Sequence, residues 1–110
     1  MHKTIIFILK QTIDISPFVT FSHLIIQNDW EIIDENSLKH QNKIIYFDYI
    51  ITDEIRISEY LNLEKEDEKL ITNYFLQTSM ENIYAIGDAN SCLASVSDQL
   101  LKIYEDITTK

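Results

Sequence analysis

A single glycine, Gly87, occurs in the 110 residues of this chain. The Gly-x-Gly-x-x-Gly fingerprint, which brings the backbone close to the pyrophosphate of a dinucleotide, needs three glycines and is therefore excluded. The length suffices for one domain with one core, but not for two nucleotide-binding domains side by side. We therefore expect residues 1–110 to form a single domain that binds one cofactor at most.

Charge and cysteine content exclude several classes of function. The net charge is −9 and the basic residues are scattered, which argues against binding to nucleic acid or to an anionic membrane surface. Cys92 is the only cysteine, so the chain alone forms no disulfide, no Cys-x-x-Cys redox pair and no cysteine-rich zinc site. The apolar run from Ile5 to Leu9 is far shorter than the roughly 20 residues that span a bilayer. We expect a soluble cytoplasmic protein.

Short apolar runs rich in β-branched residues predict most of the secondary structure. Strands are expected at residues 3–10, 23–26, 30–33, 70–76 and 83–86, with a connection around Pro17. The longest run, residues 43–52, is apolar on both faces except at Asp48, which predicts one strand near the middle of a sheet. A short helix is expected over residues 55–61, and the charged run from Glu64 to Lys69 predicts a solvated turn.

An apolar stripe near the C-terminus predicts an amphipathic helix. Its members recur at spacings of three and four residues and are Leu93, Val96, Leu100, Ile103 and Ile107. Asn90 or Ser91 is suited to cap the helix, which we expect to run from Cys92 to Thr108. The predicted fold class is therefore α/β, with a small sheet of short strands packed against this C-terminal helix.

Gly87 follows the strand expected over residues 83–86, in the segment whose residues most clearly suit the binding of a ligand. Glycine lets the backbone approach a ligand, the carboxylate of Asp88 can accept hydrogen bonds from hydroxyl groups, and a following helix offers free N–H groups. Such an arrangement can hold a phosphorylated cofactor. Taken alone, Asp88 is better explained as a cap of the final helix, because aspartate is a preferred capping residue.

Residues 77–89 read QTSMENIYAIGDA. This segment resembles the second FAD-contacting motif of thioredoxin-reductase-like pyridine nucleotide-disulfide oxidoreductases, with Glu81-Asn82 in place of the usual Pro-Gly turn. Asn82 suits such a turn because asparagine tolerates positive φ. Residues 43–110 resemble the C-terminal part of the FAD domain of that family, and residues 1–42 are interpreted as a possible remnant of the end of its nicotinamide domain.

The resemblance implies a truncated FAD/NAD(P)-binding domain of Rossmann-like fold with FAD as the cofactor. The cofactor-binding residues that it implies are Gly87, Asp88, Ala89, Leu93 and Ala94. The loop before the expected helix is shorter than is usual in the family, and Cys92 stands where a polar residue is common. No catalytic residue is assigned, and the histidines have no metal-ligand spacing.

Two functions remain open at this point. The chain is either a thioredoxin-reductase-like flavoprotein fragment or subunit, not catalytic alone, or a non-enzymatic protein-interaction module that keeps the fold without the cofactor. In the first case a partner chain supplies the rest of a reductase. In the second case the partner surface is the apolar stripe of the C-terminal helix or an apolar face of the sheet, with a homodimer as one form. A gene fragment without a function of its own is a further alternative.

Overall fold

A computed structural model describes residues 3–110. Its centre is a four-stranded parallel sheet in the order β2-β1-β6-β9. The strands are β1 (Thr4–Ile8), β2 (Ser22–Ile26), β6 (Tyr49–Thr52) and β9 (Ile83–Ala85). They confirm the strands predicted near both ends of the chain. The sheet joins strands from residues 1–42 to strands from the rest of the chain.

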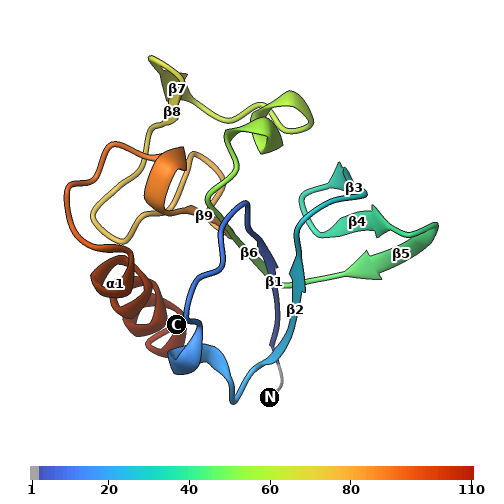
Figure 1. Cartoon of the computed structure of the whole chain (residues 1–110), viewed down its shortest axis with the longest axis horizontal. Helices are drawn as coiled ribbons and strands as arrows, with labels where there is room; N and C mark the ends of the chain where they lie inside the picture. The colour runs from blue at the N-terminus through green and yellow to red at the C-terminus, as the bar shows by residue number, and fades with distance from the viewer. Residues whose placement is uncertain (1–2) are drawn as a thin grey trace.

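Smaller elements surround this sheet (Figure 1). A three-stranded antiparallel sheet connects β2 to β6 and consists of β3 (Trp30–Asp34), β4 (Ser37–His40) and β5 (Lys43–Tyr46). The hairpin of β7 (Lys65–Glu66) and β8 (Lys69–Leu70) contains the predicted solvated turn. The helices are the 3₁₀ segments η1 (Ser16–Phe18), η2 (Ile55–Glu59) and η3 (Gly87–Ala89), and one α-helix, α1 (Val96–Thr108). The protein is thus a small α/β structure with one C-terminal helix.

The single strand predicted over residues 43–52 is wrong, because the chain divides there between two sheets. β5 lies in the antiparallel sheet and is largely exposed, whereas every residue of β6 is buried in the parallel sheet. Asp48 fixes the break: its carboxylate accepts the Thr4 N–H at 2.8 Å, and its own N–H donates to the Thr4 carbonyl at 2.9 Å. The polar interruption in the run therefore ends one strand and positions the next.

The strand predicted over residues 70–76 is also wrong, apart from Leu70 in β8. The Asn73 side-chain oxygen accepts the N–H groups of Phe75 and Gln77, at 2.9 and 3.0 Å, which closes a turn instead of an extended ladder. Leu76 then takes a φ of +69°, outside the range of a strand.

The core lies on the two faces of the parallel sheet. Figure 1 shows α1 and η1 on one side of this sheet and the antiparallel sheet on the other. The buried residues on the helix side are Ile5, Phe7, Leu9, Ile15, Phe18, Tyr49, Ile51, Leu76, Tyr84, Ile86, Leu100, Ile103 and Ile107. The opposite side buries residues of β3, β4 and η2 against Ile6, Ile8 and Ile50. Alternate residues of β1 thus serve both halves of the core.

Helix α1 starts later than the sequence predicts, at Val96 and not at Cys92. Ser95 is its N-cap, and the Ser95 hydroxyl accepts the Asp98 N–H at 3.2 Å. Asn90 holds the preceding chain in a loop, since its side-chain oxygen accepts the Cys92 N–H at 2.8 Å. Leu93 is therefore fully exposed and does not belong to the apolar stripe.

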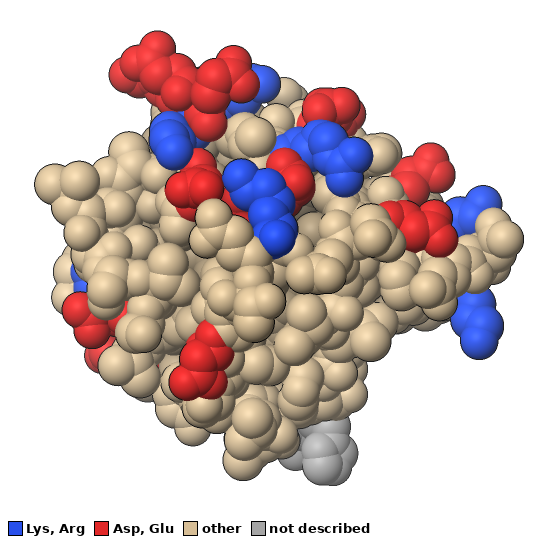
Figure 2. Space-filling view, in the orientation of Figure 1, with Lys and Arg blue, Asp and Glu red and all other residues tan. Residues whose placement is uncertain are grey.

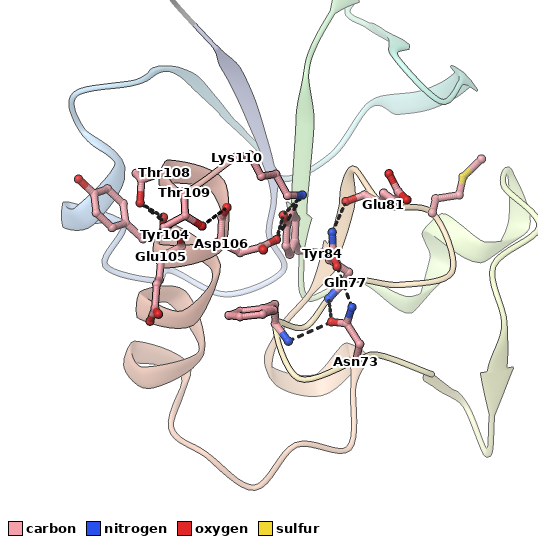
Figure 3. Close-up of polar contacts among 12 residues, drawn as sticks. Asn73, Gln77, Glu81, Tyr84, Tyr104, Glu105, Asp106, Thr108, Thr109 and Lys110 are labelled. Atoms are coloured by element: carbon pink, nitrogen blue, oxygen red, sulfur yellow. Dashed lines mark hydrogen bonds and ion pairs between the residues drawn. The ribbon is translucent and has the colours of Figure 1, made fainter.

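The C-terminal end of α1 is fastened to β9 by a polar cluster (Figure 3). The Tyr84 hydroxyl donates to the Asp106 carboxylate at 2.5 Å, and the Lys110 ammonium lies 3.2 Å from the same carboxylate. Burial raises the pKa of Tyr84, so its hydroxyl stays protonated and remains a donor. Within residues 3–110, no helix has the length and apolar character needed to cross a membrane.

Candidate functional site

The residues that follow the parallel strands meet at the carboxyl edge of the sheet. Lys10 follows β1, Asp53 follows β6, and Gly87 and Asp88 follow β9. Figure 2 shows charged groups concentrated in the upper part of the view, where this edge lies, and few charges over the centre and lower part. Open α/β sheets bind ligands at this edge, so it is the candidate site.

Gly87 adopts a φ of +54° at the end of β9. A Cβ atom placed there would lie 3.6 Å from Val96 Cγ2 and 3.7 Å from Asp53 Cβ, which are ordinary contact distances. The left-handed backbone, and not a lack of space, therefore favours glycine at this position. The Gly87 N–H donates to Gln99 Oε1 at 3.0 Å, which ties the turn to α1.

Asp88 lies in the first turn of the three-residue η3 and does not cap α1, whose N-cap is Ser95. Its side chain is 62% exposed, and its carboxylate lies 3.6 Å from the Lys10 ammonium. The Asp88 carbonyl accepts a hydrogen bond from the Lys69 ammonium at 2.7 Å. The carboxylate thus points into solvent, with one basic neighbour, and can accept hydrogen bonds from ligand hydroxyl groups.

A contact between Lys10 and Asp53 closes the crevice between β1 and β6. The Lys10 N–H donates to the Asp53 carboxylate at 2.7 Å, and Asp53 is 3% exposed. Burial raises the pKa of Asp53, and hydrogen bonds from the N–H groups of Lys10 and Gln11 oppose this rise only in part. The strand order reverses at this crevice, where a dinucleotide fold places its pyrophosphate. A buried carboxylate occupies that position here.

The crossover from β1 to β2 also lacks the element that would bind a pyrophosphate. Residues 9–21 contain only the three-residue η1, where a dinucleotide fold has a helix with its N-terminus toward the phosphates. The residues of this chain therefore do not fit the ADP half of FAD.

The remaining residues that the resemblance implies are Ala89, which ends η3, and Leu93 and Ala94 in the loop between η3 and α1. Ala89 is buried, Ala94 is half-buried, and the Leu93 side chain extends into solvent. Within residues 3–110, the N–H groups of Leu93 and Ala94 donate no hydrogen bond. Gly87, Asp88 and Ala89 are thus adjacent at the sheet edge, and the loop places two free N–H groups beyond them.

Gln99 holds this loop in place, a role that the sequence analysis missed. It is 1% exposed; Oε1 accepts from the Gly87 N–H and from the Asn90 amide, at 3.0 and 3.1 Å, and Nε2 donates to the Ala94 carbonyl at 2.8 Å. The sequence feature that could have revealed this role is the position of Gln99 on the apolar side of the helix, three residues after Val96 and four before Ile103. A buried amide at an apolar position indicates a polar partner nearby.

Other expectations concern single residues. Glu81 and Asn82 form the expected turn before β9, but Asn82 does not use positive φ and donates its side-chain amide to the Glu35 carbonyl at 2.6 Å. Cys92 is half-buried. Residues 3–110 hold no cluster of three or more metal-binding side chains, and His2 lies outside the described residues.

Comparison with known proteins assigns no family. No protein-family model and no curated protein matches the chain. Among solved structures, it is similar to a ferredoxin-flavin thioredoxin reductase from Clostridium acetobutylicum, with a TM-score of 0.38 and 14% identity over 98% of this chain. The chain spans 50% of the length of that reductase. At this TM-score the likeness is a weak one.

Proposed function

We propose that the chain is a thioredoxin-reductase-like flavoprotein subunit that contributes the flavin-side half of an FAD site and depends on a partner chain for the ADP-side half. The observation that carries the proposal is the position of Gly87 and Asp88 at the carboxyl edge of a parallel sheet, directly after β9. In this proposal the sheet is a reduced Rossmann-like fold, and the protein acts in the cytoplasm.

The chemistry of this edge suits the ribityl chain and the flavin ring. Asp88 presents an exposed carboxylate that can accept hydrogen bonds from ribityl hydroxyls. The free N–H groups of Leu93 and Ala94 can donate to the carbonyl oxygens of the flavin ring. Gln99 holds the backbone of the turn and the loop in one conformation, which lowers the entropy cost of binding.

The need for a partner follows from the Lys10 and Asp53 contact. A pyrophosphate brought to the crevice would meet the buried carboxylate of Asp53 instead of free N–H donors. The net charge of −9 adds long-range repulsion. We therefore propose that the isolated chain binds flavin weakly and is not catalytic by itself.

Titration of flavin fluorescence tests the proposal. The chain is titrated against FMN and FAD, with ADP as a competitor, and we expect both flavins to be quenched while ADP has no effect. Asp88→Ala removes the acceptor of the ribityl hydroxyls and is expected to weaken FMN binding about tenfold, as for the loss of one hydrogen bond to a charged group. Glu105→Ala, which removes an exposed carboxylate on α1, is the control and leaves binding unchanged.

Two results would contradict the proposal. One is the absence of quenching both for the chain alone and for the chain mixed with the products of adjacent genes. The other is quenching that is equal in wild type and Asp88→Ala.

An interaction module without cofactor is the second candidate function. It is favoured by β2, an edge strand of the parallel sheet on which Leu24 and Ile25 are 38% and 48% exposed. An exposed apolar edge can pair with a strand of another chain. A dimer that dissociates on dilution in size-exclusion chromatography and is lost in Ile25→Lys, combined with no flavin binding, would favour this function over the first.

A further inference from the structure

A hollow in the surface lies away from the Gly87 turn, beside β3 and η2. It has a volume of about 300 Å³ and is formed by the start of β3, by Lys39 of β4, by the β4–β5 turn and by Arg56 of η2. It shares no residue with the candidate flavin site. Its volume is at the lower end of the range for small-molecule sites, so a ligand with few heavy atoms would fit.

Trp30 forms one wall of this hollow and has an unused donor. The side chain is 6% exposed, and its indole N–H has no acceptor among residues 3–110. Buried polar groups in folded proteins almost always have a hydrogen-bond partner. The N–H of Trp30 is an exception, and its nitrogen has almost no accessible surface, so a ligand in the hollow would contact the indole ring and not this N–H.

Arg56 supplies charge beside the indole. Its guanidinium carbon lies 4.8 Å from the centre of the Trp30 ring. Within the described part of the chain, the guanidinium forms no ion pair and no hydrogen bond. Arg56 is also the only arginine of the sequence. A planar guanidinium with free N–H groups fits a carboxylate, which can accept from two of them at once.

Acidic residues on the same walls restrict the class of ligand. Asp29 and Glu31 flank Trp30 and also line the hollow, so a simple anion would be repelled from that side. Asp29, Gln41 and Asn42 have φ angles of 57°, 51° and 64°, so two lining turns are built from left-handed residues without glycine. A ligand that carries both charges matches the two basic and two acidic side chains.

We propose that this hollow binds a small zwitterion of the α-amino acid class, with its carboxylate toward the guanidinium of Arg56 and its ammonium toward Asp29 and Glu31. The proposal is independent of flavin binding, because the two sites use different residues. Experiments can therefore refute the flavin proposal or the zwitterion proposal separately.

Trp30 is the only tryptophan, so its fluorescence reports directly on this hollow. The full chain is titrated with a panel of free α-amino acids, with the N-acetyl amides of the same amino acids, and with acetate. We expect a saturable change in emission for at least one free amino acid, and binding at least about tenfold weaker for its N-acetyl amide and for acetate, since each lacks one of the two charges.

Variants of the basic residue make the test specific. Arg56→Gln is expected to abolish the response, and Arg56→Lys, which keeps the charge but not the planar fork, to weaken it about tenfold. Lys65→Gln on exposed β7 is the matched control and is expected to bind as the wild type does. The proposal is overturned if no free amino acid gives a saturable change, if acetate binds equally well, or if Arg56→Gln responds as the wild type does.

Discussion

Replacing Gln99 by methionine tests whether one buried amide organises the candidate site. Methionine has a similar length and no hydrogen-bonding amide, so the change leaves the Gly87 N–H, one N–H of Asn90 and the Ala94 carbonyl without their partner. A hydrogen bond contributes about 1 kcal/mol net, and a buried group left unpaired costs up to about 3 kcal/mol. Gly87 and Ala94 are only half-buried, so water replaces part of the loss. We therefore expect the free energy of unfolding to fall by about 2–4 kcal/mol.

Urea denaturation followed by Trp30 fluorescence measures this change. With a slope near 2 kcal/mol per molar urea, the midpoint should fall by about 1–2 M while the slope stays the same. Gln11→Met, at an exposed glutamine, is the control and should stay within about 0.5 kcal/mol of wild type. If Gln99→Met is as stable as Gln11→Met, Gln99 does not hold the loop and the account of the site is wrong.

Two further predictions concern the sheet edge. Gly87→Ala should lower the free energy of unfolding by about 1–2 kcal/mol and Gly87→Asn by less, because the space is free and only the left-handed backbone is costly; equal losses in urea titrations would contradict this. Because the pKa of Asp53 is raised in the fold, its contribution to stability is complete below its unfolded pKa of about 3.8 and is lost as the pH rises through the folded pKa. The stability of wild type relative to Asp53→Asn, measured by urea titration from about pH 4 to pH 7, should therefore fall with rising pH, and a constant difference would refute the assignment.

The pattern of apolar residues within one segment was enough to predict those strands and helices that depend on that segment alone. Strands β1 and β9 are short apolar runs, and helix α1 carries an apolar stripe along its length, so these elements follow from residue type and spacing. The start of α1 did not follow. Ser95 competes with Asn90 and Ser91 as a cap. The Asn90 side chain donates to the Ala85 carbonyl and accepts from the Cys92 N–H, and these bonds hold the chain after Asn90 in a loop.

Some parts of the candidate site could be predicted from the sequence and others could not. The segment around Gly87 and Asp88 could be found in the sequence, because a turn after an apolar strand is a local feature. The residues that define its surroundings could not. Lys10 and Asp53 are separated by 43 positions, and the stacking of Arg56 on Trp30 joins η2 to the start of β3. Neither contact produces a repeating pattern in the sequence from which it could be predicted.

By itself, the sequence determined that one glycine is available, that no glycine-rich phosphate loop can form, and that strands dominate before a final helix. Only the tertiary structure decided that the run over residues 43–52 serves two sheets and that a carboxylate lies in the crevice between β1 and β6. The physical reason is that propensity and spacing act over a few neighbouring residues, whereas a buried charge and a strand break depend on which distant backbone groups fold against them.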